Sequence, residues 1–220
     1  MIKTDDNNSK HIKSFIYKPL TRYLLPFLLF AIFSEFEHLV DYKWKFLLYT
    51  TKIFFSFLAF LILFKGFWHE LKGKFDWIAV VVGIAVLMLW LCPYFFFNKK
   101  PVFTTTLSHN FKAVMTYFFC TSIIIPIFEE IFWRSFLMRF FISIDFLSIK
   151  LGTYRHLSFW LTAVMFALLH SKADWGVAFI AGIAYGWYLV KSKNLIGCII
   201  AHSITNFGLT MVLLVIYRLP

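Results

Sequence analysis

The stretch "IIIPIFEEIFWRSFLMRFF", residues 123–141, places two adjacent glutamates and an arginine where nearly every other side chain is apolar. An ionised side chain at the centre of a membrane helix costs about 2.5 to 3.5 kcal/mol on insertion scales. Such residues therefore face the interior of a helix bundle and usually mark a functional site. Glu129, Glu130 and Arg134 are the first candidates for such a site.

The composition around this stretch is that of a membrane protein. Hydrophobic residues make up 60% of the 220 residues, and the mean hydropathy is +0.75. A hydrocarbon core about 30 Å thick needs roughly 17 to 25 apolar residues in a helix. The candidate spans lie at 22–40, 46–64, 77–97, 111–128, 156–171, 175–190 and 194–217. The sequence therefore predicts an all-α, polytopic transmembrane bundle with about seven or eight helices.

No linker, low-complexity tract or repeat divides these blocks. We therefore expect a cytoplasmic tail at 1–21 and one transmembrane domain at 22–217, with its motif-bearing core at 111–217. The sequence leaves open whether 111–147 crosses the membrane once, with a kink at Pro126, or twice. Gly182 and Gly186, four residues apart, predict close helix packing.

The charge balance is strongly basic, with 22 Lys and Arg against 11 Asp and Glu. In a soluble protein this would suggest a nucleic-acid partner. Here the basic residues lie mostly between apolar blocks, so contact with the lipid bilayer explains them better and no nucleic acid is expected. The basic N-terminal tail favours a cytoplasmic N-terminus, and no removable signal peptide is evident. We expect a multi-pass integral protein of a bacterial inner (cell) membrane.

Helical geometry separates the three charged residues of the opening stretch. Glu130 and Arg134 are four positions apart, so they share a helix face, and the acid lies N-terminal to the base as such pairs prefer. Glu129 is rotated by about 100° from its neighbour and can address a different partner. A buried ion-pair knot, in which both glutamates share Arg134, is the structural alternative.

Three further polar residues interrupt the apolar blocks downstream: His170, His202 and Asn206. Each alone has an ordinary explanation, such as an interfacial histidine or a helix–helix hydrogen bond. Together with the glutamates they supply a carboxylate base, an imidazole, and an imidazole–amide pair that can donate to a developing oxyanion. This set is sufficient to activate water and cleave a carbonyl compound without a side-chain nucleophile.

Other hydrolytic chemistries have weaker support in the sequence. There is no H-E-x-x-H motif, although a metal site of one glutamate and two histidines assembled in space stays open. There is no G-x-S-x-G motif, and the three cysteines lie inside apolar blocks with no C-x-x-C spacing. We therefore expect no cofactor, with a bound metal ion as the alternative.

The polar residues fall into three motifs that resemble a known family. "EEIFWR" matches E-E-x-x-x-R, "FALLH" at Phe166 to His170 matches F-x-x-x-H, and "HSITN" matches H-x-x-x-N. In this order and spacing they resemble the CAAX-protease and bacteriocin-processing (CPBP, or Abi) family of intramembrane glutamic endopeptidases, over about residues 111–217. The chain also looks similar to a CAAX prenyl protease-related branch that accompanies exosortase-type sorting systems, which would make such a system a partner.

The resemblance implies a site inside the membrane, open to water on one side. The residues that it marks as catalytic are Glu129, Glu130, Arg134, His170, His202 and Asn206. Glu129 with His170 would activate the attacking water, while the neighbouring glutamate and arginine would hold the geometry and charge of the site. The histidine and asparagine of the third motif would stabilise the oxyanion, and no metal would be strictly required.

The expected function is therefore that of an intramembrane endopeptidase. It would use a water activated by glutamate and histidine to cleave a peptide bond in a membrane-associated protein or peptide. Removal of a prenylated C-terminal tripeptide is not carried over, because prenylated substrates are mostly eukaryotic. The alternative is a non-catalytic immunity or scaffold protein, or a small-solute transporter, that uses the same buried polar residues.

Overall fold

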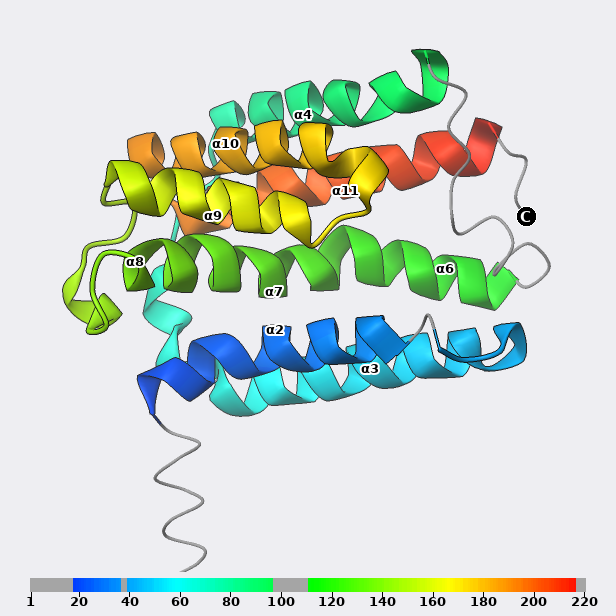
Figure 1. Ribbon diagram of the computed structural model, residues 1–220, viewed down its shortest axis with the longest axis horizontal. Helices are drawn as coiled ribbons and strands as arrows, with labels where there is room; N and C mark the ends of the chain where they lie inside the picture. The colour runs from blue at the N-terminus through cyan, green and yellow to red at the C-terminus, as the bar shows by residue number, and fades with distance from the viewer. Residues whose placement is uncertain (1–17, 37–38, 97–110, 217–220) are drawn as a thin grey trace, which may run out of the picture.

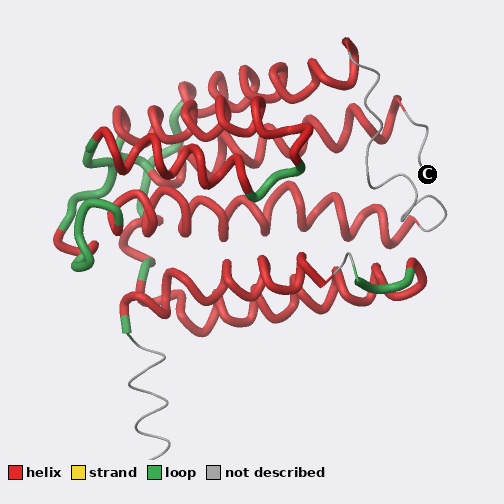
Figure 2. The backbone as a smooth tube through the Cα atoms, viewed as in Figure 1, coloured by secondary structure: helices red, strands yellow, loops and turns green. Residues whose placement is uncertain are grey.

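The computed structural model describes residues 18–36, 39–96 and 111–216, and within these ranges the chain is helical with no strand (Figure 2). The long helices lie side by side along one axis (Figure 1). Their bounds are α2 Pro19–Phe36, α3 Tyr42–Leu63, α4 Trp77–Phe96, α6 Phe111–Phe119, α7 Ile125–Glu130, α8 Met138–Phe140, α9 His156–Leu168, α10 Trp175–Ser192 and α11 Leu195–Ile216. The predicted all-α bundle is confirmed, with seven long helices in the described part if α6 to α8 count as one.

Helices α6, α7 and α8 form one continuous run over residues 111–140, which we call the motif helix (Figure 1). They are joined by two wide π turns, Cys120–Ile124 and Ile131–Leu137. Pro126 has no N–H, and in an α turn its ring would clash with the carbonyl group of Ser122. The first π turn contains Ser122 and accommodates the proline without breaking the helix. The chain therefore crosses the bundle once in this region.

Six helical segments are long and apolar enough to cross a membrane within the described ranges, so this is a multi-pass integral membrane protein. Helix α9 is the exception, because its 13 residues extend only about 20 Å. The predicted span 156–171 is wrong in this respect. The helix ends at Leu168, where a tight turn closed by Ser171 donating to Asp174 (2.6 Å) leads into α10. In Figure 1 this turn lies inside the outline of the bundle.

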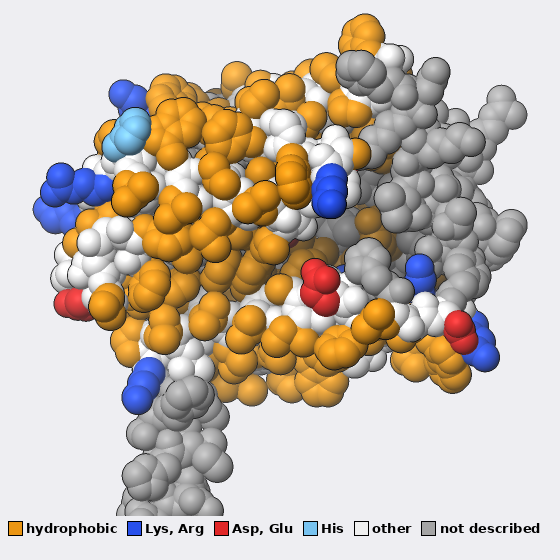
Figure 3. Space-filling view, in the orientation of Figure 1, with side chains coloured by type: hydrophobic (Ala, Val, Ile, Leu, Met, Phe, Trp, Pro, Cys, Tyr) orange, Lys and Arg blue, Asp and Glu red, His pale blue; other side chains and the backbone are white. Residues whose placement is uncertain are grey.

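Positive charge gathers at one end of the bundle. Helices α2, α4, α9 and α11 begin at this end, and α3, α8 and α10 end there (Figure 1). Its basic residues are Lys18, Arg22, Lys65, Lys72, Lys74, Arg139, Lys150, Arg155, Lys191 and Lys193. The opposite end of the described helices carries Lys43, Lys45 and Lys112, and Lys172 lies at the turn between α9 and α10. Figure 3 shows a largely apolar face between the two ends, with isolated charged patches on it. The positive-inside rule predicts that this basic end is cytoplasmic.

A buried polar network ties the motif helix to the N-terminal half at the basic end. Glu70, on the 3₁₀ turn Trp68–Leu71, accepts hydrogen bonds from the Tyr23 hydroxyl (2.8 Å) and from Nη2 of Arg139 (2.7 Å). Its other oxygen accepts from the Ser135 hydroxyl. The side chains of the Glu70–Arg139 pair are only 4% and 5% exposed, so the pair is removed from water with its lone pairs satisfied.

Small residues set the closest helix contacts. A Cβ added at Gly83 on α4 would lie 2.6 Å from the carbonyl oxygen of Ala201 on α11. A Cβ at Gly182 would lie 3.2 Å from the Cα of Ala163, and one at Gly186 would lie 3.1 Å from the Phe159 ring. The close packing predicted from the two α10 glycines is therefore confirmed, and α9 is the helix that packs against them.

We predict that Gly83→Ala lowers the free energy of unfolding by about 1–3 kcal/mol, because the added methyl group has no room against the α11 backbone. The control is Gly176→Ala, where an added Cβ meets nothing within 4 Å. Both changes share the gain in helix propensity. Thermal unfolding in detergent compares the two variants, and equal midpoints would contradict the α4–α11 contact.

We predict that Glu70→Gln lowers the free energy of unfolding by about 3–5 kcal/mol, because it leaves the Arg139 guanidinium buried without its counter-ion. The double variant Glu70→Met/Arg139→Met should recover more than half of that loss, since it removes both charges together. Reversible unfolding in bicelles measures both variants. A single variant as stable as the parent would show that the network does not hold the two halves together.

Candidate active site

Glu130 and Arg134 form a buried ion pair on the inner face of the motif helix. Oε2 of Glu130 lies 3.1 Å from Nε of Arg134, with side chains 0% and 1% exposed, although the angle falls outside that of a hydrogen bond. The guanidinium lies 4.6 Å from the centre of the Phe166 ring and 5.3 Å from that of Tyr185. Its Nη2 donates to the carbonyl oxygen of Gly182 (3.4 Å). Helices α9 and α10 thus enclose the charge of the motif helix.

His202 on α11 lies between the two glutamates. Its Nδ1 is 2.8 Å from Oε1 of Glu130, and its Nε2 is 3.7 Å from Oε2 of Glu129. An ionised carboxylate only accepts hydrogen bonds, so Nδ1 carries the hydrogen that is donated to Glu130. The imidazole stacks on the Tyr185 ring at 5.1 Å, which fixes its plane. His202 therefore connects the enclosed ion pair to Glu129, whose side chain is 16% exposed.

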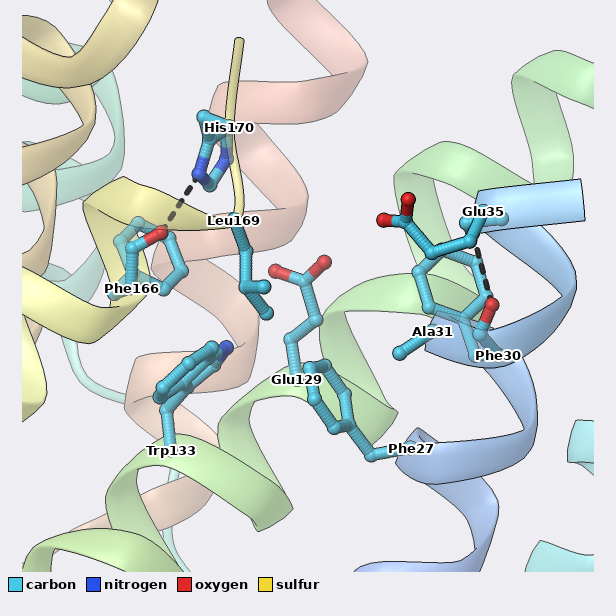
Figure 4. A pocket seen from close by; sticks show the side chains of 10 residues that line it. Phe27, Phe30, Ala31, Glu35, Glu129, Trp133, Phe166, Leu169 and His170 are labelled. Carbon is cyan, nitrogen blue, oxygen red and sulfur yellow. Dashed lines mark hydrogen bonds between the residues drawn. The ribbon is translucent and has the colours of Figure 1, made fainter. Parts of the chain in front are cut away.

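Glu129 and His170 line one cavity of about 270 Å³. At about 30 Å³ per water molecule, this space has room for several waters or for a short piece of peptide. The lining side chains are those of Phe27, Phe30, Ala31, Ser34, Glu35, Glu129, Trp133, Phe166, Leu169 and His170. Figure 4 shows the Glu129 carboxylate pointing into this space, with the imidazole of His170 at the end of α9 beyond Leu169. The two groups face the same cavity without a direct bond between them.

The hydrogen bonds of His170 determine which ring nitrogen is free. Its Nδ1 lies 2.9 Å from the carbonyl oxygen of Phe166. A carbonyl oxygen only accepts, so Nδ1 carries a hydrogen, and in the neutral form of the ring Nε2 is then the nitrogen with the free lone pair. The backbone carbonyl of His170 accepts from the indole of Trp175 (3.1 Å), which fixes the turn. With Nδ1 engaged in this way, Nε2 of the neutral His170 ring can accept a proton or a hydrogen bond from water.

Asn206 lies one turn after His202 on α11 and outside the described lining of the cavity. Its Nδ2 donates to the carbonyl oxygen of Thr121 (3.0 Å), in the first π turn of the motif helix. One of its two amide hydrogens is therefore engaged. Arg134 and His202 contact Glu130, His202 also lies beside Glu129, and Glu129 and His170 line the cavity. Asn206, the sixth candidate residue, lies outside that lining and ties α11 to the motif helix.

Sequence reasoning missed Tyr185, which supports two of the candidate residues. This residue is 1% exposed, and its ring contacts both His202 and the guanidinium of Arg134. Its hydroxyl donates to Thr205 (2.7 Å), whose own hydroxyl bonds the carbonyl oxygen of Gly83 (2.9 Å). The available signal was a tyrosine three residues after Gly182, on the packed face of α10.

Within the described ranges, no set of three His, Cys, Asp or Glu side chains is arranged to hold a metal ion. The three cysteines are free thiols, of which Cys120 and Cys198 are buried.

Comparison with known proteins gives one family match. The family model "Type II CAAX prenyl endopeptidase Rce1-like" matches residues 110–208, a range that contains all three motifs. No curated protein and no solved structure matches the chain. The match specifies no narrower branch, so the association with exosortase systems stays a prediction. Over residues 110–208, a little under half of its length, the chain is similar to the Rce1-like family of type II CAAX prenyl endopeptidases within the CPBP group.

Proposed function

We propose that this protein is an intramembrane endopeptidase that hydrolyses a peptide bond in a membrane-associated protein or peptide. The observation that carries the proposal is the cavity lined by both Glu129 and His170, with Nδ1 of His170 engaged by Phe166 so that Nε2 is the ring nitrogen left to accept. The match of residues 110–208 to a family model of CAAX-type proteases supports the same class of reaction. The exosortase-type sorting system remains a proposed partner on the resemblance alone.

In the proposed reaction, a water molecule donates one hydrogen to the Glu129 carboxylate and the other to Nε2 of His170. Its free lone pair then faces the carbonyl carbon of the substrate. Glu129 accepts the proton as the water oxygen bonds to that carbon, and the carbonyl electrons move to the oxygen. Collapse of the oxyanion breaks the C–N bond, and the amine leaves with the proton from Glu129.

His202 and Asn206 have supporting roles in this proposal. His202 donates a hydrogen bond from Nδ1 to Glu130, so Nε2 is the ring nitrogen that faces Glu129. In the proposed reaction the ring is an imidazolium, so Nε2 also carries a hydrogen, which orients the Glu129 carboxylate and then donates to the oxyanion. The second amide hydrogen of Asn206 is a further oxyanion donor, because the first is engaged by Thr121.

We predict that Glu129→Gln and His170→Ala each lower proteolysis by about 10²–10⁴-fold, because each removes a group that activates water. The measurement is quantitative mass spectrometry of membrane-protein termini in cells that produce each variant at equal level. His156→Ala is the control, since this histidine is exposed at the start of α9.

New termini that persist in both variants would overturn the proposal, and a cellular phenotype that survives with them would favour the non-catalytic alternative. Termini that disappear in the parent protein on chelation, together with stoichiometric zinc in the purified protein, would identify a metal-dependent hydrolase instead.

We predict that Tyr185→Leu lowers kcat about tenfold or more, because His202 loses the ring that fixes its plane. Tyr185→Phe keeps the ring and loses only the hydrogen bond to Thr205, which is worth about 0.5–1.5 kcal/mol. It should therefore stay within about threefold of the parent protein, and kcat and KM measured separately distinguish the two variants. Equal activities would show that the stacking does not position His202.

A further inference from the structure

We propose that Glu35 is a specificity-determining residue that makes the cavity select a peptide segment with a Lys or Arg side chain beside the scissile bond. The inference rests on the proposed function and adds the chemical class of the substrate. It also specifies the side of the membrane from which the substrate comes, which is the side opposite the basic end.

The cavity has a closed floor and an open mouth. Its floor consists of Phe27, Trp133 and Phe166, which are 6%, 2% and 2% exposed. Its mouth consists of Glu35 and Leu169, which are exposed, and of the half-buried His170. Helix α2 begins at the basic end (Figure 1) and carries Glu35 in its last turn, so this carboxylate lies remote from that end. By the positive-inside rule we infer that the substrate reaches the mouth from the extracytoplasmic side.

The described lining of the cavity is acidic, although two lysines lie next to it: Lys52 bonds the lining residue Ser34, and the exposed Lys172 comes two residues after His170. The described lining contains two carboxylates and one imidazole, and no Lys or Arg. Glu35 makes no hydrogen bond or ion pair with any described residue. The ammonium group of Lys52 on α3 bonds Ser34 (3.1 Å) and lies over the rings of Phe30 and Tyr49, outside the lining. A carboxylate at a cleft with apolar walls concentrates positive charge from its surroundings.

The wall between the mouth and the floor suits the stem of a basic side chain. Phe27, Ala31 and Glu35 are spaced four residues apart, so they form one stripe along the face of α2 that lines the cavity. Figure 4 shows Glu35 across the cavity from Glu129, with Ala31 on the wall between them. Phe30 adds a second aromatic ring to this wall. Lys and Arg pack their stems on such surfaces and keep the charged group at a polar rim.

Helix α2 lies outside the range that matches the family model. The residues that line the cavity thus come from two sources: Glu129, Trp133, Phe166 and His170 lie within the matched range, whereas Glu35 and its stripe lie in the N-terminal half. A change on α2 can therefore alter which segment is accepted while the proposed chemistry stays the same.

Binding to an inactive protein tests the selectivity without cleavage. The protein carries Glu129→Gln and is reconstituted in bicelles, and the probes are single-span membrane peptides with one flank position set to Lys, Gln or Glu and scanned over ten positions. At one or two positions we expect the Lys peptide to bind about tenfold more tightly than the Gln peptide, as for an ion pair in a partly desolvated cleft. Adding Glu35→Gln should abolish this preference, and Glu35→Lys should transfer it to the Glu peptide.

The control is Asp41→Asn, which removes another exposed carboxylate at the same end of the described bundle, outside the lining of the cavity. It should keep the preference for Lys. A preference that persists in Glu35→Gln, or no binding of any peptide, would overturn the inference. Binding that follows the charge at position 35, without cleavage by the parent protein, would refute only the proposed function. Cleavage at a rate that does not depend on the charge at position 35 would refute only the selectivity.

Discussion

A carboxylate and a guanidinium removed from water stabilise a fold only when their geometry is good and their remaining hydrogen-bonding groups are met. Here that pair is Glu130 and Arg134 of the motif helix, both fully enclosed, and it is only partly satisfied: Oε2 of Glu130 and Nε and Nη1 of Arg134 have no hydrogen bond among the described residues. Helix α11 supplies His202 to the carboxylate, and α10 supplies the carbonyl oxygen of Gly182 to the guanidinium. The rings of Phe166 on α9 and Tyr185 on α10 pack against the guanidinium group. Three helices therefore have to meet the motif helix at one depth and in one rotation.

The enclosed pair also explains why the adjacent glutamate differs from it. The charge of Glu130 is paired with that of Arg134, whereas the one ion-pair partner of Glu129 among the described residues is His202 at 3.7 Å, and its carboxylate otherwise faces the cavity. Successive residues on a helix point about 100° apart, so one glutamate can be structural while the next reaches a substrate. The proposed chemistry depends on this division, and the proposed selectivity adds a wall from α2.

The local features were predictable from the sequence. The apolar blocks located most helices, the four-residue spacing gave the Glu130–Arg134 pair, and two glycines marked the α9–α10 contact. The rest depends on long-range contacts. The Glu70–Arg139 pair joins residues 69 positions apart. Which group each histidine contacts depends on how far the helices are shifted along their axes relative to one another. The sequence interpretation paired Glu129 with His170, whereas the structure sets His202 beside both glutamates and His170 across the cavity.

The division of labour between the two glutamates is tested most directly by the free energies of unfolding of Glu129→Gln and Glu130→Gln, measured in the same bicelles. The enclosed ion pair predicts a loss of about 3–5 kcal/mol for Glu130→Gln, because Arg134 is left buried without its counter-ion. It predicts a change within about 1 kcal/mol for Glu129→Gln, whose side chain reaches the cavity. Equal losses, or a larger loss for Glu129→Gln, would contradict it.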